Sequence, residues 1–212
     1  MLVDLHIHES SFSSDSRMTL EEIVAAARQK GLDGICITDH DSMGLKDHAE
    51  EYSRRTGYPI FVGVEYYSLW GDITAWGIES FPAERIPAQD FIDHVREQGG
   101  FCVACHPFRN NNRGFEDNLR NARGLNGVEV LNGSTDMAAN RKALAYCTEI
   151  GLVPVGASDV TWKSQVGRYS TWLPGAGTTI AGVAKLEEFG LRNAVMQAVH
   201  AGALRSKELG KN

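Results

Sequence analysis

Short apolar runs rich in β-branched residues alternate along the chain with amphipathic helical patterns. The clearest helical pattern follows Thr19, where Glu22 completes a capping box and apolar residues recur at helical spacing up to Gly31. Further helices are expected at 43–55, 88–98, 136–150 and 191–201. Strands are expected at 2–7, 34–38, 60–65, 101–105, 127–131 and 153–157, with a strand or hairpin at 66–78. This alternation predicts an α/β fold in which helices cover the outer face of a parallel sheet.

Length and composition restrict the classes of protein that fit. The 212 residues suit one domain, expected to span 1–212, and 42% hydrophobic with 23% charged residues is typical of a globular chain. The formal charge of −6 and the lack of a basic block argue against an extended nucleic-acid surface. No run approaches the roughly 20 apolar residues of a membrane span, and no signal peptide is evident, so a cytoplasmic protein is expected. Cys102 and Cys105 lie in a predicted strand and are expected to be small, reduced core residues.

Ionisable side chains follow the ends of several predicted strands. These residues are His6 and His8, Asp39 and His40, Glu65, His106, and Asp159. Because sites in parallel α/β folds gather at the carboxyl ends of the strands, these groups should converge at one rim. Both imidazoles of the His6–Ile7–His8 pair face the same side of a strand, where two nitrogens can reach one ion. The sequence therefore predicts a metal site.

Five motifs carry a resemblance to a known family. They are Asp4-Leu5-His6-Ile7-His8, Thr38-Asp39-His40-Asp41-Ser42, Gly63-Val64-Glu65, Ala104-Cys105-His106-Pro107 and Gly156-Ala157-Ser158-Asp159. In order and spacing, the chain from Leu2 to about Leu173 resembles the PHP (polymerase and histidinol phosphatase) family. The resemblance implies a distorted (β/α)7 barrel of TIM-like type that holds one to three divalent metal ions. The donors suit Zn²⁺, Mn²⁺ or Fe²⁺.

The resemblance also implies roles for individual residues. The first metal would be held by His6, His8, Glu65 and Asp159. Glu65 would bridge to a second metal held by His106, and a third would be held by His40 and Asp15. Glu65, Asp159, His40 and Arg168 are the expected catalytic residues, and Arg109 and Arg168 are the expected phosphate-binding residues. Asp41 and Ser42 are expected to orient His40.

Two positions depart from the family pattern. Thr74 stands where the family places a histidine on a later strand, and Thr161 replaces the histidine of a terminal Asp-x-His motif. A threonine hydroxyl is a weaker metal ligand than imidazole. The second and third metals therefore each lose one protein ligand in this chain.

The function implied by the resemblance is hydrolysis of a phosphate ester by metal-activated water, on a small phosphorylated metabolite or nucleotide. Two alternatives stay open. An amidohydrolase-type barrel also begins with a His-x-His strand, but it uses a bridging lysine where this chain has Glu65. The threonine departures would also suit a degenerate PHP domain that binds metal without catalysis. Neither the substrate nor the oligomeric state follows from the sequence.

Overall fold

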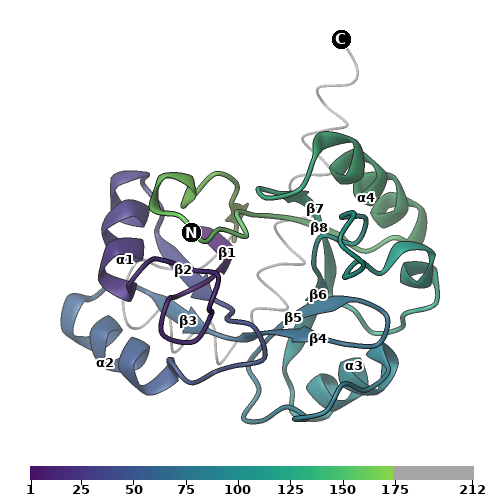
Figure 1. The fold of residues 1–212 in the computed structure, drawn as a ribbon, viewed down its shortest axis with the longest axis horizontal. Coiled ribbons are helices and arrows are strands. Elements are labelled where there is room, and N and C mark those ends of the chain that lie inside the picture. Colours follow the sequence, from purple (N-terminus) through teal and green to yellow (C-terminus); the bar gives the residue numbers. More distant parts are fainter. Residues whose placement is uncertain (174–212) are drawn as a thin grey trace.

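The computed structural model describes residues 1–173, whose nine strands form two sheets with helices on their outer sides (Figure 1). The first sheet has the order β3-β2-β1-β9, with β1 Leu2–Ile7, β2 Gly34–Ile37, β3 Ile60–Val62 and β9 Thr171–Trp172. The second has the order β4-β5-β6-β7-β8, with β4 Val64–Tyr67, β5 Asp72–Trp76, β6 Phe101–Ala104, β7 Gly127–Asn132 and β8 Val153–Ala157. The helix expected at 191–201 lies outside the described residues.

Helices α1 and α2 cover the first sheet, and α3 and α4 cover the second (Figure 1). Their bounds are α1 Leu20–Gln29, α2 Lys46–Thr56, α3 Ala88–Glu97 and α4 Met137–Ile150, with 3-10 turns η1 Glu116–Arg120 and η2 Lys163–Gln165. The predicted capping box is confirmed: the backbone N–H of Glu22 donates to Thr19 Oγ1, and that of Thr19 donates to Glu22 Oε2. None of the helices within residues 1–173 has the length and hydropathy to cross a membrane.

The strand expected at 60–65 is in fact two strands that belong to different sheets. Gly63 separates them, and a Cβ at this position would lie 2.2 Å from the carbonyl oxygen of Ala75. Only glycine permits this close approach of backbones. The expectation of a parallel sheet is also wrong around β5, which runs antiparallel to both β4 and β6. A short turn after β4 returns the chain directly, and a parallel partner would need a longer crossover.

The two sheets meet along both margins through single bridges. At one margin Ile7 pairs with Val160, and the backbone N–H of Asp159 donates to the carbonyl of His6 at 2.8 Å. At the other, His40 pairs with Glu65. Because the ladders stop there, residues 1–173 form two adjoining sheets and no continuously hydrogen-bonded barrel. Of the predicted metal ligands, His40 and Glu65 lie at one of these margins, and His6 and Asp159 lie at the other.

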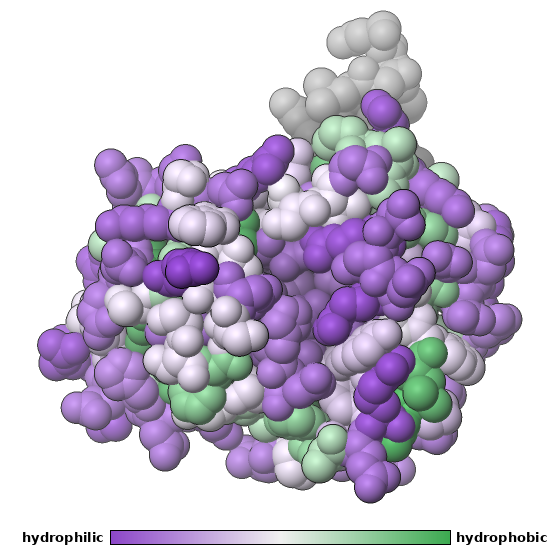
Figure 2. Space-filling view, in the orientation of Figure 1, coloured by the Kyte–Doolittle hydropathy of each residue, from purple (hydrophilic) through white to green (hydrophobic). Residues whose placement is uncertain are grey.

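Three groups of buried apolar side chains hold this arrangement together. The largest lies between α3, α4 and the second sheet, where Phe91 is fully buried and stacks on Tyr66 with ring centroids 4.0 Å apart. A second fills the space between α1 and the first sheet, and a third, including Val3 and Val155, lies between the sheets. The face seen in Figure 2 is largely hydrophilic, with small, separate apolar patches.

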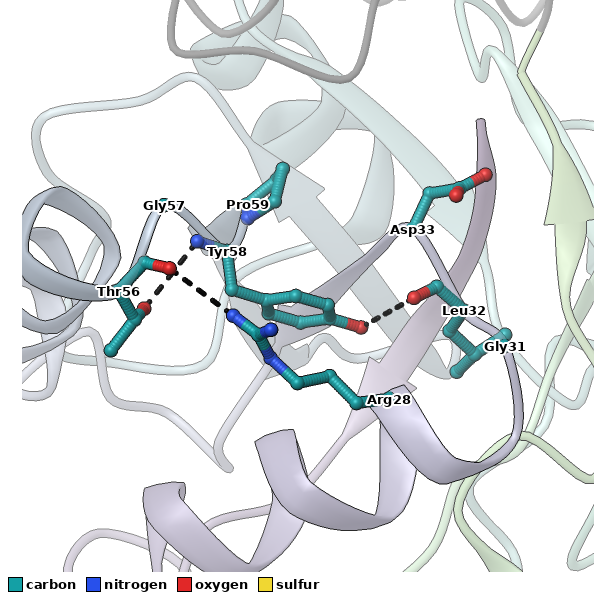
Figure 3. A pocket seen from close by; sticks show the side chains of 8 residues that line it. All are labelled: Arg28, Gly31, Leu32, Asp33, Thr56, Gly57, Tyr58 and Pro59. Atoms are coloured by element: carbon teal, nitrogen blue, oxygen red, sulfur yellow. Dashed lines mark hydrogen bonds between the residues drawn. The ribbon is translucent and has the colours of Figure 1, made fainter.

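A surface pocket lies at the amino ends of β2 and β3, away from the carboxyl ends where the ionisable residues gather (Figure 3). Its polar groups are paired with one another. The Tyr58 hydroxyl donates to the carbonyl of Leu32 at 3.0 Å, and Arg28 Nη2 donates to the carbonyl of Thr56 at 3.2 Å. These contacts join the end of α1 to the end of α2, which gives the pocket a structural role.

Candidate metal centre

Glu65, the second residue of β4, lies at the centre of a group of four imidazoles, of which those of His6, His8 and His106 are buried. Its Oε2 is 3.2 Å from His6 Nε2, 3.3 Å from His8 Nε2 and 2.9 Å from His40 Nδ1. Its Oε1 is 2.9 Å from His106 Nε2. The two carboxylate oxygens thus face separate groups of ring nitrogens, the arrangement of a carboxylate that bridges two ions.

Asp159, which follows β8, approaches the same group from the opposite side. Its Oδ1 lies 3.3 Å from His8 Nε2 and 3.6 Å from His6 Nε2. The structure therefore brings together all four residues predicted to hold the first metal. His106, predicted for the second, is in contact with them through Glu65.

Two of these residues have unusual backbone conformations. Asp159 has φ 48° and His106 has φ 33°, in the left-handed region that side chains with a Cβ seldom adopt. Such conformations cost about 1–3 kcal/mol each and persist where surrounding contacts enforce them, typically in functional sites. Each residue lies two positions after a strand end, His106 with its side chain against Glu65 and Asp159 with its side chain against His8.

The predicted third-metal residues lie at the outer edge of the group. His40 Nε2 is 3.4 Å from Asp15 Oδ2, and these side chains are 34% and 51% exposed. Thr74 and Thr161, the two threonines that depart from the family pattern, both form hydrogen bonds with backbone groups outside the group of ligand candidates. The buried Thr74 hydroxyl donates to the carbonyl of Val103, and the carbonyl of Thr161 accepts from the backbone of Arg17.

Mutual attraction stabilises the charged forms of these buried groups. Burial alone would raise the pKa of Glu65, but the neighbouring histidines hold it well below its usual range. Burial would likewise lower the pKa of His6, yet Asp159, Glu129 and Glu65 raise it well above its usual value. Burial also opposes the charge on His40, and hydrogen bonds to Asp15 and Glu65 outweigh it and raise its pKa to about 10. Strong coupling of this kind is typical of functional sites.

The donor atoms fit divalent metal ions. Histidine nitrogens and carboxylate oxygens lie within 4.8 Å of one another in sets that include His6–His8–Asp159 and His8–His40–Glu65. In addition, the buried Nδ1 of His106 has no hydrogen-bond partner, although most buried polar atoms are paired. Cys105, expected in the core, has its Sγ 3.8 Å from Glu65 Oε1 and so borders the group.

A family model described as "PHP domain" matches residues 4–142, about two thirds of the chain. The chain belongs to the PHP family. Its strand-end histidines and acids are therefore those of a PHP domain, as the sequence motifs indicated. The family assignment covers all the ligand candidates except Asp159, which lies beyond the matched segment.

Several proteins similar to this PHP chain have described functions. A 3',5'-nucleoside bisphosphate phosphatase of Chromobacterium violaceum is 38% identical over 86 residues, which cover 39% of this chain and 29% of that protein. A phosphoribosyl 1,2-cyclic phosphate 1,2-diphosphodiesterase of Eggerthella lenta is 34% identical over 65 residues, 31% of this chain and 24% of that protein. The matched segments thus span less than a third of either relative.

Solved structures share the fold. A Bifidobacterium adolescentis protein described as a candidate metal-dependent phosphoesterase superposes with a TM-score of 0.63 at 19% identity, covering 86% of this chain and 94% of that one. At this identity the similarity establishes the mixed α/β architecture.

The C-terminal part resembles a different family. A model for pyrroline-5-carboxylate reductase dimerisation matches residues 170–209. In a separate comparison, 35 residues of the chain are 63% identical to the pyrroline-5-carboxylate reductase of Synechocystis, and they cover 16% of this chain and 13% of the reductase. The PHP chain therefore carries segments similar to two families, and the second begins at β9.

Glu129 is a buried acid of the PHP site that the sequence reasoning missed. Its Oε1 lies 2.8 Å from His6 Nδ1, and its Oε2 accepts the backbone N–H of His106 at 3.0 Å and the Asn132 side chain at 2.8 Å. Asn132 in turn donates to Asp159 Oδ2 at 2.9 Å. The sequence does contain a signal for it, because Glu129 is a single carboxylate between apolar neighbours in the strand predicted at 127–131. Such acids hold ligand histidines in the correct tautomer and orientation.

His8 has its own supporting group. Its Nδ1 lies 3.3 Å from Ser13 Oγ, which donates to Asp39 Oδ1 at 2.9 Å. Asp41 and Ser42, expected to orient His40, instead accept backbone N–H groups of Tyr67 and Gly44. That expectation was wrong because both residues fix turns of the chain beside the site.

The two predicted phosphate-binding arginines occupy different environments. Arg109 is partly buried and donates to Asp159, to Asn132 Oδ1 at 2.7 Å and to Thr135 Oγ1 at 3.0 Å, so it belongs to the metal centre. Arg168 is exposed after η2, and its backbone N–H donates to the carbonyl of Gln165. Arg113, which was not predicted, has its Nε 2.6 Å from Asp72 Oδ2.

Proposed function

We propose that this chain is a metal-dependent phosphoesterase that hydrolyses a small phosphorylated molecule. The observation that carries the proposal is Glu65, whose two carboxylate oxygens face separate sets of buried histidine nitrogens. Family membership supports the same reading. The two sheets together would make up the expected distorted TIM-like barrel, interrupted at its margins.

The residues divide into holding and supporting roles. His6, His8, Glu65 and Asp159 would hold the first ion, Glu65 and His106 the second, and His40 with Asp15 a third. Ions bound there would supply a water of lowered pKa and positive charge opposite the phosphate oxygens. Glu129 accepts from His6 Nδ1, which leaves His6 Nε2 free to face Glu65 and Asp159. These positions support the proposed catalytic roles of Glu65, Asp159 and His40.

Arg109 is the better placed of the two predicted phosphate-binding residues. It contacts Asp159 and keeps 21% of its side chain exposed, so its guanidinium can meet a ligand that enters beside the metal centre. A guanidinium fork binds two phosphate oxygens at once. Arg168 is exposed in the turn after η2, and its predicted catalytic and phosphate-binding roles remain part of the proposal.

The names of the relatives suggest which substrates to test. One acts on a 3',5'-nucleoside bisphosphate and the other on a cyclic phosphate diester. Both are small molecules, which agrees with the chain's net charge of −6 and its lack of a basic block. We propose a substrate of this size, cleaved as a monoester or a diester.

An amidohydrolase has less support in the described residues. Lys46, Lys142 and Lys163 lie in α2, α4 and η2 and not in a strand of the site. The degenerate alternative rests on Thr74 and Thr161. It is weakened because the residues proposed for the first metal are all present and in contact.

The decisive experiment measures metal content and phosphoester hydrolysis together. The Mn²⁺-loaded chain is assayed on p-nitrophenyl phosphate, bis-p-nitrophenyl phosphate and nucleoside 3',5'-bisphosphates. Turnover is expected in the wild type and in His48→Ala, an exposed histidine outside the centre, and should be lost in Glu65→Gln. Two bound ions with no turnover of any phosphoester would refute the proposed activity. Hydrolysis of amides alone would favour the amidohydrolase alternative.

We further propose that residues 170–209 mediate contact between two copies of the chain, because their family model describes a dimerisation segment. Light scattering on the full chain is expected to give the mass of a dimer. A monomer at micromolar concentration would contradict this proposal and leave the phosphoesterase proposal untouched.

A further inference from the structure

Asp72 is a fully buried acid beside the metal centre that neither the sequence motifs nor the comparisons single out. It begins β5, and strand alternation puts it on the same face as Thr74, two residues further on. Thr74 pairs directly with Glu65 across the antiparallel ladder. Asp72, Thr74 and Glu65 therefore share the face of the sheet that carries the centre.

The distances connect Asp72 to the second-metal residues. Its Oδ2 lies 3.7 Å from His106 Nε2, and that nitrogen is 2.9 Å from Glu65 Oε1. The Thr74 hydroxyl is engaged with the carbonyl of Val103, 3.4 Å away. Of the two polar residues of β5 on this face, the one that reaches His106 is the carboxylate.

The hydrogen bonds of Asp72 are incomplete. Arg113 Nε donates to its Oδ2 at 2.6 Å, but the buried Oδ1 of Asp72 and the buried Nη2 of Arg113 have no hydrogen-bond partner. An arginine that serves only to neutralise a buried acid commonly forms two parallel hydrogen bonds, which would satisfy both atoms. Leaving a buried polar oxygen unpaired is costly. The arrangement orients the carboxylate and leaves one oxygen available.

We propose that Asp72 is a ligand of the second metal ion, completing a set with Glu65 and His106 in place of the imidazole that this chain lacks at position 74. The inference rests on the proposed metal centre. Arg113 acts through Asp72 as a positioning residue. A carboxylate in place of an imidazole shifts the second site towards ions that prefer oxygen, such as Mn²⁺.

The test is Mn²⁺ binding to the full chain, measured by equilibrium dialysis with elemental analysis. The wild type is expected to bind at least two ions with distinct affinities. Asp72→Asn should weaken the second ion at least about tenfold and leave the first unchanged. Thr74→Val, on the same strand and face, is the matched control and should keep both affinities. Wild-type binding of both ions by Asp72→Asn would overturn the proposal.

Cys105 offers the competing donor, since its Sγ also lies near Glu65. If Cys105→Ser loses the second ion and Asp72→Asn keeps it, the thiolate is the ligand and Asp72 is not. Far-UV circular dichroism checks that each variant is folded. If Asp72→Asn fails to fold, anomalous diffraction from Mn²⁺-soaked wild-type crystals decides the question. A manganese peak within about 2.2 Å of an Asp72 oxygen is expected, and a peak bound by Glu65 and His106 without Asp72 overturns the assignment.

The outcomes separate this inference from the proposed activity. If the wild type binds two ions through Asp72 but hydrolyses no phosphoester, the activity fails and the ligand assignment stands. If Asp72→Asn retains both ions and turnover, the assignment fails and the activity stands.

Discussion

At the scale of single residues, a few buried carboxylates determine how the imidazoles of the centre are oriented. Glu129 contacts His6 through one oxygen and the backbone of His106 through the other, so it links residues proposed for two different ions. Arg109 also contacts a proposed ligand, Asp159, but its side chain stays 21% exposed, whereas Glu129 is buried. The proposed roles of the two residues, support of ligands for Glu129 and phosphate binding for Arg109, lead to different predictions for their variants.

Replacing Glu129 by Gln should lower metal affinity by about 10–100-fold, because the supporting acceptor of a ligand histidine becomes a neutral amide. Metal content after dialysis against graded free Mn²⁺ measures the change. Glu149→Gln, an exposed acid paired with Arg120, provides the control and should bind metal as the wild type does. Equal affinities in the two variants would contradict the supporting role of Glu129.

Replacing Arg109 by Met should reduce kcat/KM for a phosphoester by about 10–100-fold, the usual cost of a lost charged hydrogen bond. The number of bound ions should stay the same, since Arg109 is not a proposed ligand. Steady-state kinetics and elemental analysis on the same sample check both statements. If Arg109→Met lost metal but kept the wild-type kcat/KM for each metal-loaded chain, the result would argue against a role of Arg109 in phosphate binding.

Metal binding that engages His40 should strengthen as pH rises. In the metal-free chain, Asp15 and Glu65 raise the pKa of His40 to about 10, so its ring is protonated at neutral pH and must lose that proton to bind an ion. Affinity should rise by up to about tenfold per pH unit for each proton released. Calorimetry at pH 7 in buffers of different ionisation enthalpy should detect the release, and His40→Gln should release less. Identical release in both would show that His40 is not involved.

At the scale of elements, helix α3 holds the antiparallel part of the second sheet in place. Phe91→Ala should lower the free energy of unfolding by about 3–5 kcal/mol, because it empties a fully buried site against Tyr66. Leu144→Ala in α4, where the side chain is 47% exposed, should change it by less than about 0.5 kcal/mol. Urea denaturation measures both. If the two variants lost similar amounts of unfolding free energy, burial of Phe91 under α3 would not be a major source of stability.

Short sequence patterns correctly predicted the features that depend only on neighbouring residues, such as where a helix begins and which side chains share a face of a strand. The capping box of Thr19 and Glu22 marks the start of α1, and the His6–His8 pair needs only strand alternation to share one face. The split at Gly63 and the antiparallel course of β5 depend on contacts between Gly63 and Ala75 that no short window of sequence contains. The same limit hid Glu129 and Asp72, because Glu129 contacts His6, 123 residues away along the chain, and Asp72 contacts Arg113, 41 residues away. The two-residue strand β9 is too short to carry a pattern.

At the scale of the whole molecule, bound metal should stabilise the fold, because the proposed ligands come from both sheets. At an ion concentration about 100 times Kd the expected gain is about 2.7 kcal/mol, or roughly 5–11 °C in Tm for a chain of this size. Thermal unfolding with Mn²⁺ and with EDTA measures the shift. His8→Ala should lose most of it, and an undiminished shift in that variant would place the stabilising ion elsewhere.

The pairing partners of β1 determine when the first sheet can form during synthesis of the chain. β1 pairs with β2, which follows it about 30 residues later in the chain. It also pairs with β9, and its last residue, Ile7, bridges to Val160, so these two partners come from beyond residue 150. A chain leaving the ribosome therefore carries His6 and His8 long before Asp159 exists to join them. Native pairing across such sequence separations forms late. Until synthesis reaches β9, the nascent chain has an unfinished sheet edge and an incomplete ion-binding site, so capture of the first ion would coincide with the last step of folding.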